Sequence, residues 1–190
     1  MRLFVAFELP ESIKKAAADL QNELIRAGSE LGWVRPEAMH LTLKFLGETS
    51  PDRLPAIKGA LKTAAAGTGP LKVSFKGVGV FPDFRSPRVV WIGIHPEDDR
   101  LAALQSKIEQ ALAPLGFPVE GRQFRPHLTL GRIKSPGRTG GRTEGLMKSL
   151  GSHEKDRFGE CDLTRLDLIK SDLQRGGARY TQLWSFPLVP

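Results

Sequence analysis

One four-residue motif, His-Leu-Thr-Leu, occurs twice in this chain of 190 residues, beginning at His40 and again at His127. In an extended strand, successive side chains point to opposite faces of the sheet. Each motif therefore presents its histidine and threonine on one face and its two leucines on the other. We expect two similarly built strands, each anchored in a core by leucines and each offering an imidazole beside a hydroxyl.

The surroundings of the two motifs are also alike. Arg35-Pro36 stands three residues before the first motif, and Arg125-Pro126 stands directly before the second. Internal repetition of this kind indicates a chain built from two related halves. We expect the halves to face each other across a pseudo-two-fold axis. The side chains that would then converge on one cleft are His40, Thr42, His127 and Thr129.

Apolar periodicity predicts the elements that carry the motifs. Helices are predicted from Pro10 to Gly28, from Pro51 to Ala66 and from Asp98 to Leu115. Strands are predicted over residues 2–8, 39–47, 71–81, 87–94, 125–133, 161–173 and 180–189. Ser50 is in position to cap the second helix. The Gly-rich stretch Lys134–Gly145 is interpreted as a loop.

Half-buried strands mixed with amphipathic helices indicate an α/β (α+β) fold. Together with the duplication, this predicts two pseudo-symmetric lobes of antiparallel sheet with outer helices, and the paired motifs facing a central cleft. No Pro/Gly/Ser linker divides the chain cleanly, so residues 1–190 are expected to form one bilobal domain.

Composition limits the kinds of binding partner and the cellular compartment that we expect for this protein. The net charge of +7 favours an anionic partner such as nucleic acid. The single cysteine, Cys161, excludes an internal disulfide and a thiolate metal cage, and an alternating strand pattern beside it indicates a small packed residue. The apolar run from Leu3 to Leu9 is too short to span a membrane. We expect a cytoplasmic, monomeric protein with no membrane contact.

The residue types in the motifs indicate chemistry at phosphorus. Two imidazoles that titrate near neutral pH can serve as a general acid and a general base. In-line displacement at phosphorus needs both, one to deprotonate the nucleophile and one to protonate the leaving oxygen. The hydroxyls of Thr42 and Thr129 can donate hydrogen bonds to the non-bridging oxygens. Neither motif carries an acidic residue at metal-ligand spacing, so no metal and no other cofactor is expected.

At these residues the chain resembles the RNA 2′,3′-cyclic phosphodiesterases, also named 2′-5′ RNA ligases, of the two-histidine phosphoesterase superfamily. The resemblance covers "RLFVAFELP", "WVRPEAMHLTLKFLGE", "VGVFP…PRVVWIGI", "FRPHLTLGRIK" and "LIKSDLQRGGARY". It implies hydrolysis of a 2′,3′-cyclic phosphate at an RNA end, including tRNA fragments, to a 2′-phosphomonoester. It also implies that His40 is the general acid and His127 the general base. Spacing alone leaves the two roles interchangeable, and a 2′-5′ ligation activity stays open.

Residues that would bind the substrate are chosen from charged and aromatic side chains near the motifs. Between Glu120 and Glu144 the chain has basic but no acidic residues. The candidates are Arg132, Arg125, Phe45, Lys170 and Tyr180. Strict alternation places Arg132 on the face opposite His127, unless a bulge at Gly131 turns it inward. Phe45 is equally compatible with stacking on a base and with packing in the core.

Several features keep alternatives open. The stretch "FPDFRSPR", which holds Phe81, Phe84 and Arg88, fits either an RNA platform or an ordinary hairpin. His95 and His153 are interpreted as incidental. At the level of function, the alternatives are a non-catalytic RNA-binding protein of the same fold and a phosphodiesterase of small cyclic nucleotides.

Overall fold

In a computed structural model of the chain, the described residues are 1–27, 31–133, 140–174 and 177–190. The strands are β1 (Arg2–Glu8), β2 (Gly32–Trp33), β3 (His40–Glu48), β4 (Leu71–Phe81), β5 (Val89–Pro96), β6 (His127–Arg132), β7 (Arg157–Leu163), β8 (Arg165–Gln174) and β9 (Gly177–Pro187). The helices are α1 (Glu11–Arg26), α2 (Leu54–Ala65), α3 (Arg100–Leu112) and α4 (Gly140–Ser152). Short 3-10 turns cover Pro36–Ala38, Pro51–Arg53 and Ala113–Leu115.

The strands form two antiparallel sheets, one for each motif. The first sheet has the order β3-β1-β8-β9, and the second has the order β2-β6-β5-β4-β7. The first motif opens β3 at the edge of its sheet, whereas the second opens β6 between β2 and β5. The predicted α+β architecture with two antiparallel sheets is confirmed.

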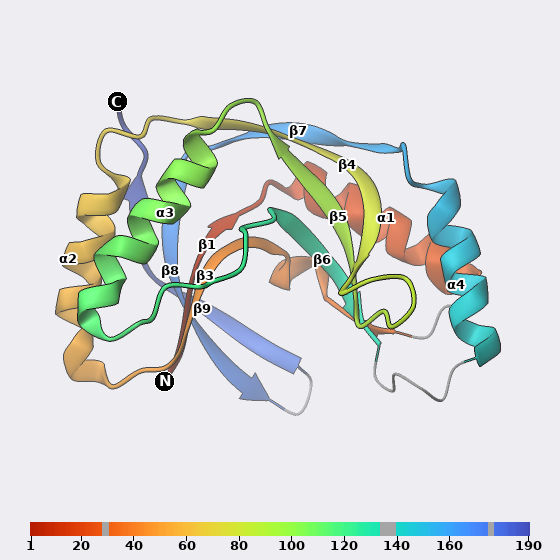
Figure 1. The fold of residues 1–190 in the computed structure, drawn as a ribbon, viewed down its shortest axis with the longest axis horizontal. Helices are drawn as coiled ribbons and strands as arrows, with labels where there is room; N and C mark the ends of the chain where they lie inside the picture. The colour runs from red at the N-terminus through yellow and green to blue at the C-terminus, as the bar shows by residue number, and fades with distance from the viewer. Residues whose placement is uncertain (28–30, 134–139, 175–176) are drawn as a thin grey trace.

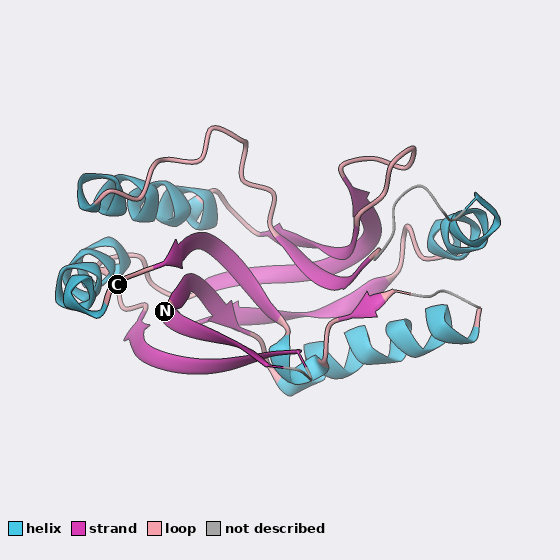
Figure 2. Ribbon diagram, turned by 90° about the horizontal axis from the view of Figure 1, so that it is seen from below, coloured by secondary structure: helices cyan, strands magenta, loops and turns pink. Residues whose placement is uncertain are grey.

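The duplication is visible in the connections. In the first half, β1 is followed by α1 and, after the short strand β2, by the motif strand β3. In the second half, β5 is followed by α3 and then by the motif strand β6. Each of these helices packs on the other half: α1 packs against β7 of the second sheet, and α3 packs against α2 and β3. Figure 1 accordingly shows α2 and α3 together on the left and α1 and α4 on the right. Figure 2 shows the strands gathered between these outer helices.

The leucines of the motifs lie in the core, as predicted. Leu41, Leu128 and Leu130 are fully buried, and Leu43 is nearly so. They belong to one hydrophobic cluster that continues through both sheets and the helices. The motif strands are therefore anchored from behind by a shared core, which limits how far they can shift.

Each motif strand carries a β-bulge at the same motif position. Pairing with β1 passes from Thr42 to Lys44 and skips Leu43, while pairing with β5 passes from Thr129 to Gly131 and skips Leu130. A bulge inserts one residue and so reverses the alternation beyond it.

This reversal determines on which face of the strand two of the predicted substrate-binding side chains lie. Phe45 and Arg132, each five residues after its motif histidine, return to the same face as that histidine, and both are exposed. The bulge anticipated at Gly131 is therefore present one residue earlier, at Leu130. Phe45 is 59% exposed, so the core-packing alternative is wrong.

Three local predictions differ from the structure. The strand expected over 161–173 is divided at Thr164 into β7 and β8, which belong to different sheets. Residues 140–145 of the expected loop form the start of α4, whereas 134–139 lie outside the described residues. Leu146 and Leu150, one helical turn apart, are buried, so tertiary packing stabilises a Gly-rich helix of low intrinsic propensity. The hydroxyl of Ser50 binds the Asp52 carboxylate and caps no helix N–H.

Candidate active site

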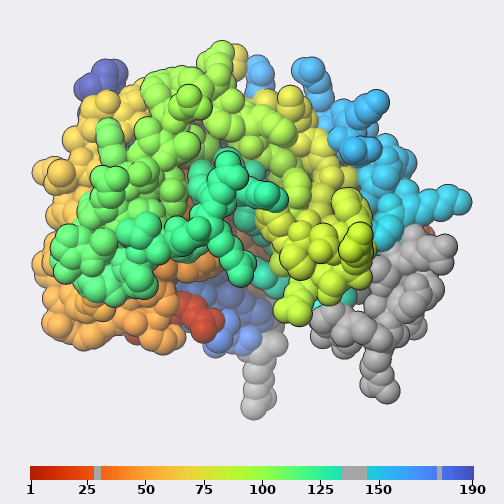
Figure 3. Space-filling model, viewed as in Figure 1, coloured from red at the N-terminus to blue at the C-terminus, as the bar shows by residue number. Residues whose placement is uncertain are grey.

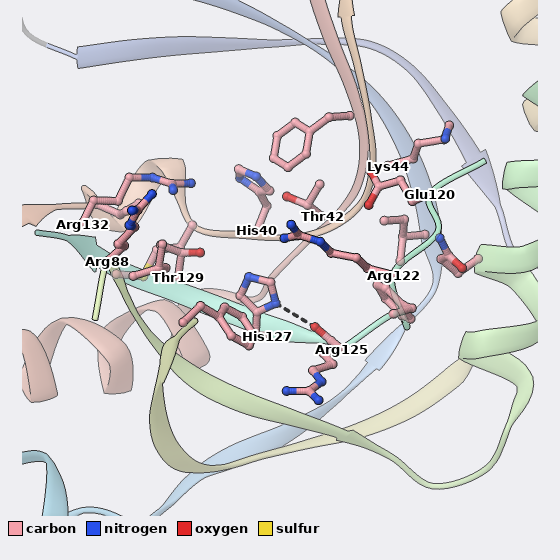
Figure 4. Close-up of a pocket in the computed structure, with 18 of the residues that line it drawn as sticks. His40, Thr42, Lys44, Arg88, Glu120, Arg122, Arg125, His127, Thr129 and Arg132 are labelled. Carbon is pink, nitrogen blue, oxygen red and sulfur yellow. Dashed lines mark hydrogen bonds between the residues drawn. The ribbon is translucent and has the colours of Figure 1, made fainter. Parts of the chain in front are cut away.

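The two motifs meet in a cleft with a volume of about 990 Å³. His40 and Thr42 line it from β3, and His127 and Thr129 line it from β6. Figure 3 shows a hollow in the middle of this face of the molecule. Figure 4 shows the two histidines on strands from opposite sides of the cleft. The structure thus brings together the four polar side chains that the duplication predicts.

Both imidazole rings are held in the same tautomer. Nδ1 of His40 lies 2.8 Å from the carbonyl oxygen of Ala38, and Nδ1 of His127 lies 2.7 Å from that of Arg125. A carbonyl oxygen only accepts, so each Nδ1 carries a proton and donates it. The Nε2 atom of each ring is then left to exchange protons with a substrate. The partner is two residues before the histidine in both halves.

Aromatic side chains pack around the imidazoles. The His40 ring lies 4.6 Å from the Phe4 ring and 5.3 Å from the Tyr180 ring, measured between centroids. The His127 ring lies 4.9 Å from the Phe81 ring, edge to face. These contacts fix the orientation of each ring and remove part of its surface from water.

Burial lowers the pKa values of both histidines. Loss of solvation lowers the pKa of His40 from its ordinary value to about 4, against the opposing effect of the Ala38 hydrogen bond. The pKa of His127 is lowered by burial too, and the positive charge of Arg132 acts in the same direction. Both imidazoles are therefore neutral in the free protein at neutral pH. An anion bound between them would raise both pKa values.

Cationic and polar side chains surround this pair. The charged residues that line the cleft are Lys44, Arg88, Glu120, Arg122, Arg125 and Arg132. Figure 4 shows Arg88 and Arg132 together on one side of the histidines and Arg122 entering from the other. A phosphate between the histidines would meet positive charge from two directions, which suits a polyanionic substrate.

Four of the five predicted substrate ligands line the cleft: Arg125, Arg132, Phe45 and Tyr180. Lys170 is not among its lining residues, and its Nζ pairs with Asp172 at 2.9 Å. The reason is strand parity. Ile169 and Ser171 share the cleft face of β8 with Phe4 and Tyr180, so Lys170 between them points to the opposite face. The placement of Lys170 at the substrate is a prediction that the geometry does not support.

Other cleft residues gave weaker signals in the sequence. Arg88 and Arg122 are visible as basic residues near the motifs, but pattern alone does not select them. Lys44, Gln105 and Glu120 give no signal, because only the fold brings α3 and the segment after it to β3. Part of the stretch "FPDFRSPR" belongs to the cleft: Phe81 packs on His127 and Arg88 lines the cleft, whereas Phe84 is exposed.

The remaining candidate groups lie outside the cleft. His95 Nε2 lies 3.2 Å from the Lys76 carbonyl oxygen, and His153 Nδ1 lies 2.7 Å from the Asp156 carboxylate. Cys161 is half-buried on β7, and burial raises the pKa of its thiol to about 11. Across the part of the chain that the structure describes, no cluster of three metal-ligating side chains is found. Within the same residues, no helix is long and apolar enough to span a membrane.

Comparison with known proteins identifies relatives over the whole chain. A family model described as LigT like Phosphoesterase matches twice, at residues 7–91 and 92–180, one match for each half. An RNA 2′,3′-cyclic phosphodiesterase from Archaeoglobus fulgidus is 36% identical over 186 residues, covering 98% of this chain and 99% of that protein. The protein of the same name from Methanothermobacter thermautotrophicus is 31% identical and covers 99% of both chains.

Solved structures agree with these matches. The structure of TT0787 from Thermus thermophilus superposes with a TM-score of 0.80 at 29% identity, covering 99% of this chain and 98% of that one. Escherichia coli LigT in complex with 3′-AMP superposes with a TM-score of 0.76 at 26% identity, covering 100% and 98%.

Proposed function

Since the chain belongs to the LigT-like phosphoesterase family, we propose that it hydrolyses the 2′,3′-cyclic phosphate at an RNA end to a 2′-phosphomonoester. The observation that carries this proposal is the pair of histidines. Each half contributes one imidazole, with Nδ1 tied to a backbone carbonyl and Nε2 left for proton transfer across the cleft. Relatives named for this reaction are 31% and 36% identical to the chain over nearly its whole length.

The proposed reaction is an in-line displacement. Nε2 of His127 removes a proton from water, and the water oxygen forms a new bond to phosphorus. The bond from phosphorus to the 3′ oxygen breaks, and this oxygen takes a proton from Nε2 of His40. The product has a 2′-phosphate and a 3′-hydroxyl. The direction of these roles comes from the family resemblance, because the two sites have the same local geometry.

The lowered pKa values add a condition to this scheme. His40 must carry a proton before it can act as an acid, yet burial keeps it neutral in the free protein. The negative charge of the cyclic phosphate favours the imidazolium form, so substrate binding itself would favour protonation of His40. The acid is then charged only while a phosphate occupies the cleft.

The neighbouring groups are proposed to hold the substrate. Thr42 and Thr129 donate to the non-bridging oxygens, and Arg132 and Arg125 supply positive charge. Phe45 and Tyr180 offer aromatic surfaces to the terminal base. All six residues line the same cleft.

The proposal also includes the setting of the enzyme. It is a monomeric, cytoplasmic protein of one bilobal domain, residues 1–190, and its substrates include tRNA fragments. The continuous hydrophobic cluster supports the single domain, and the excess of basic residues supports RNA as the partner. No metal or other cofactor takes part in the proposed chemistry.

The direct test is an assay of the purified protein, in excess EDTA, with an RNA oligonucleotide that ends in a 2′,3′-cyclic phosphate. The expected product carries its phosphate on the 2′ oxygen, located by nuclease digestion and mass spectrometry. Bound but unreacted RNA would support the RNA-binding alternative. Unbound RNA, with hydrolysis of small cyclic nucleotides, would support the other alternative. Activity that EDTA abolishes would contradict the metal-independent scheme.

A further inference from the structure

A buried ion pair joins the strand of the first motif to the helix that precedes the second. Lys44 lies on β3, two residues after Thr42, and its Nζ binds the carboxylate of Glu109 on α3. The two side chains are only 1% and 5% exposed, respectively. Such a pair connects the two halves of the molecule at the wall of the cleft, which Lys44 lines.

The pair also binds the backbone of a third segment. Lys44 Nζ donates to the Pro118 carbonyl oxygen at 2.8 Å, and the Glu120 amide donates to Glu109 Oε2 at 3.2 Å. The other carboxylate oxygen of Glu109 accepts from Gln105 Nε2 at 3.0 Å. Both charged groups therefore hold the chain shortly after α3 ends.

The held segment, residues 117–126, leads into the second motif and belongs to no helix or strand. Its backbone hydrogen bonds near the two ends run from the Phe117 amide to Leu112 and from the Ile94 amide to Pro126. The Lys44–Glu109 pair adds the contacts at 118 and 120. The segment lines the cleft with Glu120, Arg122, Gln123, Phe124 and Arg125. Figure 4 shows Arg122 reaching from it into the cleft.

Stability alone does not account for such a pair. Removing two charges from water costs about as much as their attraction returns, and apolar pairs of similar volume often serve equally well in a core. A charged pair does offer directed bonds to backbone groups, which an apolar pair lacks. The feature that depends on the charges here is the placement of residues 117–126.

We propose that Lys44 and Glu109 are positioning residues that fix the segment 117–126 and so aim Arg122 at the phosphate bound between the two histidines. This inference rests on the proposed function, because it assigns Arg122 to the same substrate. Neither Lys44 nor Glu109 touches the reacting atoms.

The test uses the double variant Lys44→Met/Glu109→Leu, which removes both charges and leaves no buried charge unpaired. The variant is expected to remain folded, with faster hydrogen exchange across residues 117–126 and a kcat/KM for the cyclic-phosphate oligonucleotide reduced by about 10²-fold. Lys15→Met is the matched control, since Lys15 forms an exposed ion pair with Asp19. It should change neither quantity. If the double variant does not fold, Glu109→Gln, which keeps an acceptor for the Glu120 amide, should lose less activity than Glu109→Ala.

A double-mutant cycle with Arg122→Ala distinguishes positioning from a general structural effect. If the pair acts through Arg122, its loss should reduce kcat/KM far less in the Arg122→Ala background than in the wild type. Equal losses in both backgrounds would overturn the proposal, as would wild-type kcat/KM in the double variant. Unchanged hydrogen exchange in the unliganded protein would overturn it as well. A wild-type protein that leaves the RNA intact would instead contradict the proposed function, while hydrogen exchange still reports on the segment.

Discussion

At the scale of single residues, the two halves of the molecule hold their motif histidines in the same way. Each motif histidine hydrogen-bonds through Nδ1 to the carbonyl two residues earlier and packs against an aromatic ring. The rings differ in their surroundings. His40 lies near Glu8 and Lys14, whose side chains form an ion pair, and His127 lies near Arg132. Substrates with different leaving groups can therefore distinguish the role of His40 from that of His127.

The general-acid and general-base roles can be distinguished with a substrate whose leaving group needs no proton. A nitrophenolate leaves without protonation, so the general acid becomes dispensable for a nitrophenyl phosphodiester. His40→Ala should retain a much larger fraction of the wild-type rate on this ester than on RNA, whereas His127→Ala should lose a similar fraction on both. Steady-state rates of both variants on both substrates check this. The reverse pattern would exchange the two roles.

Stability should depend on pH through the same residues. The pKa of His40 is about 4 in the folded chain and near 6.5 when exposed. Between these values the unfolded chain binds more protons, so the free energy of unfolding falls as pH is lowered through this window. The difference corresponds to roughly 3 kcal/mol, and the lowered pKa of His127 acts in the same direction.

Urea unfolding tests this effect with His40→Phe as the comparison. Between about pH 7 and pH 4.5, the wild type should lose more stability than the variant, which carries no group to protonate at this site. Equal losses in the two proteins would show that His40 is not held neutral by the fold.

At the scale of elements, the β-bulges determine which side chains of the motif strands face the cleft. The sequence predicts alternating strands, and alternation alone would place Arg132 and Phe45 away from the cleft. The bulges at Leu43 and Leu130 reverse this. On β8 the alternation from Ile169 to Ser171 is unbroken, and Lys170 points to the other face.

This contrast predicts different effects for two basic residues. Arg132→Ala should weaken RNA binding and reduce the slope of log K against log salt by about one unit, because one phosphate contact is lost. Lys170→Ala should leave both the affinity and the slope unchanged. Binding titrations of the cyclic-phosphate oligonucleotide at several salt concentrations check both variants. A similar loss in the two would contradict the assignment of faces.

The elements that the sequence predicts less well are those whose identity depends on distant contacts. α4 contains several glycines and is stabilised by the burial of Leu146 and Leu150. The break at Thr164 separates two strands of like pattern, and only the assembled sheets show that they belong to different layers. Local periodicity contains neither piece of information.

At the scale of the whole molecule, the repeat made the arrangement predictable. Two copies of one motif, each on a strand with buried leucines, predict two facing lobes and a shared cleft. The sequence pattern does not predict that α1 and α3 each pack on the opposite half of the molecule, because each helix has one apolar face that suits either sheet. The contact between Lys44 and Glu109 could not be predicted either, because it forms only where α3 packs against β3.

The cleft as a whole should prefer a polymer to a nucleotide. Arginines lie on both sides of the histidines, so a longer RNA meets more positive charge than a mononucleotide does. The affinity for an oligonucleotide with a cyclic-phosphate end should fall more steeply with salt than the affinity for a cyclic mononucleotide. Equal salt slopes for the two ligands would indicate that only the terminal nucleotide is bound.

The central claim is that two histidines, one from each half, act together on one phosphorus. The most direct measurement is kcat/KM on the cyclic-phosphate oligonucleotide for the wild type, His40→Ala, His127→Ala and the variant with both changes. Each single change should cost about 10²- to 10⁴-fold, and the second change should add little, because groups that act as a unit are not additive. Near-wild-type kcat/KM in either single variant, or fully multiplicative losses in the double one, would contradict the claim.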